Sequence, residues 1–163
     1  MKTFNFYLNA SNHFLNNQNY VDLSNEERDY NHFASVLFSW VALESFINSV
    51  SESLAKGKRL NLNEIAFLNE IEYRVNEDGN FNEMNIRPST TKKILFILNH
   101  FSKFNLKNFK QNKIWRDLKN FEDLRNRIIH HKEKNKLSIN LKKATECRDI
   151  SKEAINYITK KLK

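Results

Sequence analysis

Glycine and proline are scarce in this chain, and their scarcity limits the folds open to it more than any other feature. Among 163 residues there are only 2 Gly and 1 Pro. A strand-rich fold needs such residues wherever the chain reverses direction, so little of the required turn chemistry is present. Amphipathic stretches separated by short polar segments dominate instead. The sequence therefore predicts an all-α fold.

Helix start and stop signals divide the chain into six expected helices. Ser24-Asn25-Glu26-Glu27 has the form of a capping box, in which a Ser hydroxyl and a Glu carboxylate accept hydrogen bonds from the first amides. Pro88-Ser89-Thr90 has the form of a second helix start. We expect an antiparallel bundle of five or six helices and no strand, in a single domain over 1–163. The expected helices span about 4–19, 25–56, 63–75, 90–104, 112–131 and 141–162, with a loop at 76–80.

Composition is that of a soluble globular protein, with 40% hydrophobic and 28% charged residues, and we expect a cytoplasmic location as the simplest interpretation. No apolar run is expected to approach the roughly 20 residues of a membrane span, so we expect no membrane association. The first residues lack the pattern of a signal peptide. The single cysteine, Cys147, has no intrachain disulfide partner and is expected to be inert.

The chain is basic, with a net charge of +8 and a pI near 9.5. An excess of basic residues favours partners rich in phosphate. Frequent use of Lys throughout the chain, without any such partner, would give the same net charge. Four basic residues in or just after the fifth expected helix are candidates for tracking a phosphate backbone. Alternatively, these residues only face solvent on the helix surface and bind nothing. The four are Arg116, Lys119, Arg127 and Lys132.

Two charged residues fall on apolar helix faces when about 100° is allowed per residue. Arg125 lies near the centre of an arc of Ile114, Leu118, Phe121, Ile128 and Ile129. Glu44 lies inside an arc of Phe33, Val36, Leu37, Trp40, Val41, Leu43, Ile47 and Leu54. Because an unpaired buried charge is costly, we predict a salt bridge between Glu44 and Arg125 on neighbouring helices.

That salt bridge has two interpretations. It can fix the register of the two helices and do nothing else. Alternatively, Glu44 can aim Arg125 so that the remaining N–H donors of the guanidinium face a cleft. Both can hold at once.

The stretch Arg125-Asn126-Arg127-Ile128-Ile129-His130 places an arginine, an amide and an imidazole on one helix. Asn126 lies four residues before His130 and so shares its face. His131 is adjacent and could be mistaken for the active histidine, but the spacing favours His130. The sequence has no cluster of ligands with metal-site spacing and no Gly-rich phosphate loop, so we expect neither metal nor cofactor.

The string R-N-x-x-x-H at the end of an amphipathic helix resembles the R-x4-6-H signature of the HEPN superfamily. The lead-in 118–124 looks like HEPN motif helices. The stretch 40–48 is similar to the long early helix of several HEPN families, where an acidic residue faces the motif arginine. The two expected helices that carry these regions, 25–56 and 112–131, make up about a third of the chain. The resemblance implies an HEPN-like helical bundle that forms a homodimer and brings both motifs into one composite cleft.

The resemblance also implies a reaction, which is metal-independent endoribonuclease cleavage of RNA. His130 would act as general base on the ribose 2′-OH or as the acid that protonates the leaving oxygen. Arg125 would stabilise charge in the transition state, and Asn126 would orient the phosphate or the imidazole. Glu44 and His131 would support them. Many HEPN ribonucleases act in toxin, antiphage or RNA-processing systems.

One departure from the family concerns regulation. Some HEPN toxins carry a tyrosine two residues after the motif histidine, which a nucleotidyltransferase antitoxin modifies. Lys132 stands at that position here, so this mode of control has no support, although another antitoxin or regulatory protein could bind. Two other functions stay open. One is a non-catalytic HEPN-like module that binds nucleotide, RNA or protein, and the other is an unrelated helical interaction protein.

Overall fold

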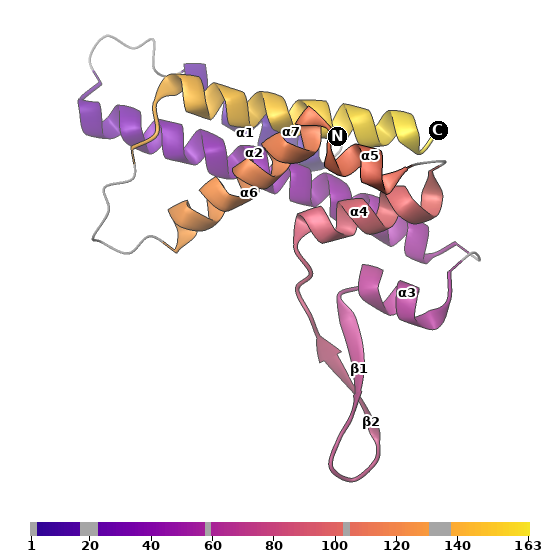
Figure 1. The fold of residues 1–163 in the computed structure, drawn as a ribbon. Helices are drawn as coiled ribbons and strands as arrows, with labels where there is room; N and C mark the ends of the chain where they lie inside the picture. The colour runs from indigo at the N-terminus through magenta and orange to yellow at the C-terminus, as the bar shows by residue number, and fades with distance from the viewer. Residues whose placement is uncertain (1–2, 17–22, 58–59, 103–104, 131–137) are drawn as a thin grey trace.

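The computed structural model describes residues 3–16, 23–57, 60–102, 105–130 and 138–163. Helices make up 74% of these residues, and a single hairpin supplies the strands (Figure 1). The mostly helical fold class is confirmed. In chain order the elements are α1 (Thr3–Asn16), α2 (Asn25–Ala55), α3 (Leu62–Leu68), β1 (Ile71–Val75), β2 (Phe81–Asn85), α4 (Thr90–Phe101), α5 (Leu106–Lys110), α6 (Lys113–Ile129) and α7 (Leu141–Lys161).

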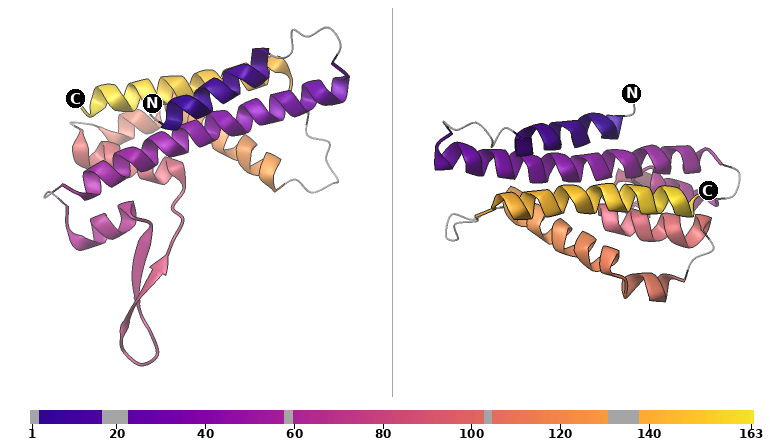
Figure 2. Two further views of the ribbon diagram at one scale, coloured as in Figure 1. Left: turned by 180° about the vertical axis from the view of Figure 1, so that it is seen from behind. Right: turned by 90° about the horizontal axis from the view of Figure 1, so that it is seen from above.

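The long helix α2 is the axis of the bundle. It begins at the predicted capping box, because the Ser24 hydroxyl accepts from the Glu27 amide and the Glu27 carboxylate accepts from the Ser24 amide. Helices α1 and α7 lie along it, whereas α6 runs at a slant to both α2 and α7 (Figures 1 and 2). The start of α4 was also predicted, since Ser89 is its N-cap. The short helix α5 was not expected.

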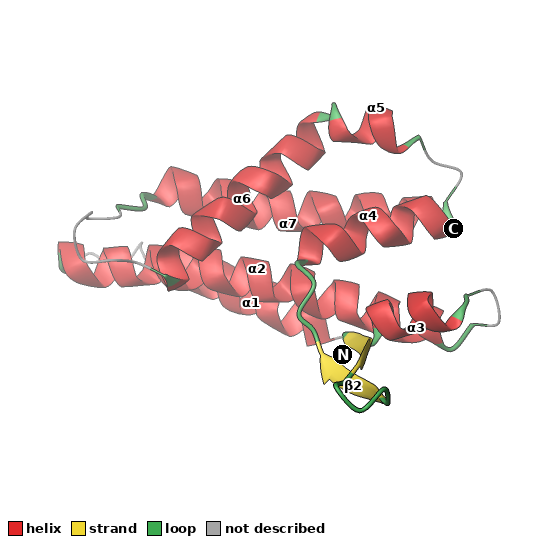
Figure 3. Ribbon diagram, turned by 60° about the horizontal axis from the view of Figure 1, so that its bottom comes forward, coloured by secondary structure: helices red, strands yellow, loops and turns green. Residues whose placement is uncertain are grey.

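The segment 63–75 is not one helix, and this prediction was wrong. Helix α3 ends at Leu68, Glu70 adopts a left-handed backbone with φ 62°, and an antiparallel hairpin follows (Figure 3). The expected loop 76–80 is its turn, where Gly79 has φ 79°. Short alternating strands of this kind are easily mistaken for the end of a helix, because five residues give little periodicity. The expectation of a strand-free chain is corrected accordingly.

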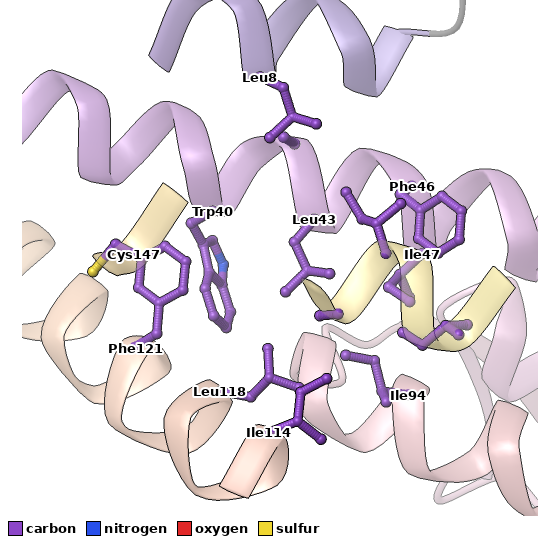
Figure 4. Close-up of a cluster of buried hydrophobic side chains, with 14 of the residues drawn as sticks. Leu8, Trp40, Leu43, Phe46, Ile47, Ile94, Ile114, Leu118, Phe121 and Cys147 are labelled. Atoms are coloured by element: carbon purple, nitrogen blue, oxygen red, sulfur yellow. The ribbon is translucent and has the colours of Figure 1, made fainter. Parts of the chain in front are cut away.

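Aromatic and branched side chains fill the core between α2 and the helices around it. Trp40 and Leu43 of α2 face Leu118 and Phe121 of α6 (Figure 4). The Trp40 and Phe121 rings meet edge to face, with centroids 5.1 Å apart. Cys147 is buried in the same region, which raises the pKa of its thiol to about 12. The expectation that this thiol is unreactive is supported by its burial.

Small polar residues let α1, α2 and α7 approach one another closely. The Ser11 hydroxyl lies 2.7 Å from that of Ser39 and 3.0 Å from that of Ser35, and these three residues are fully buried. Ser151 of α7 donates to the Ser39 carbonyl at 2.7 Å. Each hydroxyl therefore has a partner, so the seam adds few unsatisfied polar groups to the core.

Helix α2 is also more apolar than expected. An 18-residue stretch within it has a mean hydropathy of 1.4, and 44% of that stretch is buried inside the structure. By length and composition α2 could cross a membrane, so the expectation that no segment approaches such a span was too strong. Central helices of globular bundles have the same composition, and α2 packs against α1, α6 and α7 here.

Candidate functional site

The end of α6 positions the three predicted catalytic residues. Helix α6 begins after Asn112, whose side chain accepts from the Ile114 amide at 3.2 Å. Its C-cap is His130, whose backbone N–H donates to the Asn126 carbonyl at 2.9 Å. His130 therefore follows Asn126 by one helical turn and is exposed at the helix end. An exposed imidazole at that position can reach a ligand outside the bundle.

Arg125 lies between two acceptors. Its Nη1 donates to Asn126 Oδ1 at 3.0 Å, and its Nη2 lies 3.7 Å from Glu44 Oε1. The predicted contact between Glu44 and Arg125 is confirmed. The two side chains are 35% and 28% exposed, so the pair sits at the margin of the core and not inside it. Solvent screening limits the contribution of such a pair to roughly 0–1 kcal/mol.

Arg125 was expected at the centre of the buried face of α6, and this prediction was wrong. The Ile129 side chain, expected on the same face, is 48% exposed. Because α6 runs at a slant to α2, its last turn moves away from the packed surface (Figure 2). The buried residues of α6 are Ile114, Leu118, Phe121, Glu122 and Leu124.

Glu44 receives a second contact, from the first turn of α4. The Thr90 hydroxyl donates to Glu44 Oε1 at 3.2 Å, and Thr90 is only 7% exposed. The same carboxylate oxygen thus touches a hydroxyl of α4 and a guanidinium of α6. This arrangement holds Glu44 in place while it directs Arg125, because a hydrogen bond restricts the rotamers of the acceptor.

Glu122 is a buried acid that the sequence interpretation missed. It is 6% exposed, and both of its carboxylate oxygens lie 2.9 Å from the Thr91 hydroxyl of α4. Lys119 contacts the same carboxylate from the preceding turn. The signal was available, because Glu122 lies four residues after Leu118 and so shares its apolar face. Glu122 joins α4 to the motif helix one turn before Arg125.

Lys93 of α4 is also buried, with a side chain 3% exposed. Its Nζ donates to Asn48 Oδ1 at 2.9 Å and to Glu70 Oε1 at 2.5 Å. The lysine thereby connects α2 with the residue that begins the hairpin. A buried ammonium needs such partners, since an unpaired one is costly. Sequence reasoning did not identify Lys93 as a buried residue.

The candidate RNA-binding residues have different surroundings. Arg116 and Arg127 are exposed on α6 and can reach a ligand. Lys119 contacts Glu122, so its ammonium already has an anionic partner. Lys132 and His131 lie outside the described residues.

The hollow next to Glu44 does not contain the motif. It has a volume of about 360 Å³ and lies between α1 and α2, with Tyr7, Val41, Glu44 and Ser45 among its lining. Arg125, Asn126 and His130 are not part of that lining.

Metal-ligating side chains do not gather in the part of the chain that the structure describes. No group of three or more His, Cys, Asp and Glu residues there could hold a metal ion. The arrangement at the end of α6 is instead suited to bind a phosphate through arginine and to move a proton through histidine. Comparison with protein-family models, with curated proteins and with solved structures finds no match for this chain.

Proposed function

We propose that this protein is a metal-independent endoribonuclease of HEPN type, with Arg125, Asn126 and His130 as catalytic residues. One observation carries the proposal. Glu44 and Asn126 hold the Arg125 guanidinium, and His130 follows Asn126 by one helical turn. The mostly helical architecture and the net charge of +8 add support.

Arg125 is suited to bind the scissile phosphate. A guanidinium has five N–H donors in a planar fork, and the two acceptors here use only part of that set. The other donors can form bidentate hydrogen bonds to phosphate oxygens, which strengthen as negative charge develops. Because Thr90 and Arg125 contact the same Glu44 oxygen, the guanidinium is oriented before RNA binds.

His130 carries the proton transfer in this proposal. An imidazole takes the proton from the ribose 2′-OH while the 2′-oxygen bonds to phosphorus. The bond from phosphorus to the 5′-oxygen breaks, and an imidazolium returns a proton to that leaving oxygen. The products are a 2′,3′-cyclic phosphate and a 5′-hydroxyl. A strand without 2′-hydroxyl groups cannot react in this way.

The composite cleft of the proposal needs two subunits. His130 stands at the exposed end of α6, where a second α6 can approach it. Pairing two motif helices gives one imidazole as base and the other as acid. The biological setting of the proposal is a toxin, antiphage or RNA-processing system, with RNA as substrate and an antitoxin or regulatory protein as a further partner.

Cleavage of labelled RNA in the presence of EDTA tests the proposal. The wild type is expected to produce fragments with 2′,3′-cyclic phosphate ends, and His130→Ala should be slower by about 10²–10⁴-fold. The control is His13→Ala, which changes an exposed histidine on α1 and should leave the rate unchanged. Equal rates for the wild type and His130→Ala would end the proposal.

Two further variants separate catalysis from binding. Arg125→Lys keeps the charge but loses the planar fork, and it should slow cleavage while RNA binding is weakened little. Glu44→Gln keeps an oxygen acceptor for Thr90 and removes the charge that directs Arg125, so its rate should fall between those of wild type and Arg125→Lys. RNA binding without cleavage by the wild type would identify a non-catalytic HEPN-like module instead.

A further inference from the structure

The hairpin of β1 and β2 projects from the bundle. Figures 1 and 2 show it extending away from the long helices, with α3 and the start of α4 near its base. At that base Glu70 is tied to the buried Lys93, so the direction of the hairpin is set by the bundle. An isolated two-stranded ribbon is marginally stable in water. The hairpin therefore gains stability if another surface covers it.

One face of the hairpin carries three large apolar side chains, with Glu83 beside them as the direct partner of Tyr73. Val75 pairs directly with Phe81, and Tyr73 lies two residues before Val75, so these three side chains share a face. They are 59%, 75% and 50% exposed. Met84, which pairs with Glu72, is on the opposite face and is 45% exposed. Large apolar side chains exposed together on one face mark an interaction surface.

The hairpin is acidic, unlike the rest of the chain. Residues 70–87 contain five acidic and two basic side chains, a net charge of −3, whereas the whole chain carries +8. The other residues therefore carry +11. Glu77, Asp78 and Glu83 lie close in sequence to Phe81. An acidic surface repels phosphate, so the hairpin is not suited to bind nucleic acid.

An apolar hollow with basic neighbours lies elsewhere on the same protein. Its volume is about 490 Å³, and its lining comes from the start of α1, the second half of α2 and the end of α7. Lys161 and Lys163 flank the lining residue Leu162, and Lys56 follows Leu54 by two residues. Glu52 on α2 is paired with Lys56 at 2.8 Å. The lining residues are Thr3, Phe4, Phe46, Ser49, Val50, Ser53, Leu54 and Leu162.

We propose that the hairpin is a docking arm, and that Phe81 and Val75 of one copy insert into this hollow of a second copy. The two surfaces match in chemistry, since an apolar knob with acidic neighbours meets an apolar hollow with basic neighbours. The hairpin extends away from α1 and α7 of its own copy (Figure 1), so it does not point toward the hollow of that copy. This contact is separate from the motif-to-motif pairing of the proposed nuclease and does not depend on it.

Sedimentation of the full chain over a range of concentrations measures the contact. Phe81→Ser should weaken self-association by about tenfold or more, as expected for loss of an aromatic anchor at an interface. Met84→Ser is the matched control, because it removes an exposed apolar side chain from the opposite face of the same hairpin. Raising the salt concentration should also weaken association of the wild type. A wild type that is monomeric throughout, or equal association of all three proteins, would overturn the proposal.

Disulfide trapping between copies identifies the acceptor. One protein carries Phe81→Cys and another carries Ser53→Cys, which lies in the hollow, and the two are mixed and oxidised. A heterodimeric disulfide is expected, and Met84→Cys in place of Phe81→Cys should give much less. The native Cys147 is buried and does not compete. Equal trapping by the two hairpin cysteines, or none, would refute this docking site whatever the outcome of the RNA cleavage assay.

Discussion

Glu122→Ala tests how the motif helix is attached to the bundle. In the wild type the two oxygens of this carboxylate accept the Thr91 hydroxyl at 2.9 Å, and Lys119 contacts it from the helix surface. Thr91 is 2% exposed, so after the substitution water has little access to its hydroxyl. The variant therefore removes the charged acceptor of a buried donor and leaves only the Ser89 hydroxyl, 3.2 Å away, as its partner.

The magnitude follows from the two contacts. A buried hydrogen bond to a charged group contributes about 1.5–3 kcal/mol, and the contact with Lys119, whose side chain is 43% exposed, adds about 0–1 kcal/mol after solvent screening. Glu122→Ala should then lower the free energy of unfolding by about 1.5–4 kcal/mol. For a domain of this size, Tm should fall by roughly 3–16 °C. Glu122→Gln keeps an acceptor for Thr91 and should cost about 1 kcal/mol or less.

A double-mutant cycle with Thr91→Val isolates the hydrogen bond. Urea unfolding followed by circular dichroism gives the free energy of unfolding for the wild type, both single variants and the double variant. The double variant should be more stable than the sum of the single effects predicts, with a coupling energy of about 1 kcal/mol or more. Strict additivity, with a coupling energy below about 0.5 kcal/mol, would refute the assignment of Glu122 as the link between α4 and α6.

Three other predictions concern the core, the start of α2 and the buried thiol. Leu43→Ala removes a fully buried side chain and should lower the free energy of unfolding by about 2–5 kcal/mol. Ile129→Ala changes a half-exposed side chain and should lower it by less than about 1 kcal/mol. Equal midpoints of urea unfolding for the two variants would contradict the burial of Leu43. Hydrogen bonds from Ser24 lower the pKa of Glu27 below its ordinary 4.5, so their stabilising effect is complete above 4.5 and is lost as the pH falls through the lowered folded pKa. The Tm difference between wild type and Ser24→Ala should accordingly shrink in acid, and a difference independent of pH would count against the capping box. Burial raises the pKa of Cys147 to about 12, so a thiol reagent at mildly alkaline pH should label the native protein far more slowly than the urea-unfolded protein, and equally fast labelling would show that the thiol is accessible.

Local signals in the sequence were sufficient to predict most of the helices. Ser24 and Ser89 cap α2 and α4 as predicted, because capping depends on side chains within three residues of the helix start. The contact between Glu44 and Arg125 was also predictable, since a helical wheel places each charge among apolar residues, where it needs a partner of opposite sign. The spacing of Asn126 and His130 on one helix follows from helical geometry alone.

Tertiary structure decided how deeply these residues are buried and what else they touch. A helical wheel assigns one apolar face to a helix, but burial depends on every neighbour and on the angle at which they cross. The slant of α6 left Arg125 at the margin of the core, while Thr91 of α4 met Glu122 inside it. The hairpin could likewise not be predicted from local sequence, because its strands are too short to show a periodic pattern. Its base is held by the contact of Glu70 with Lys93, which lies more than 20 positions away in the chain. The sequence by itself thus determined which segments are helical and which charges need partners, whereas the packing angles between helices determined which groups meet.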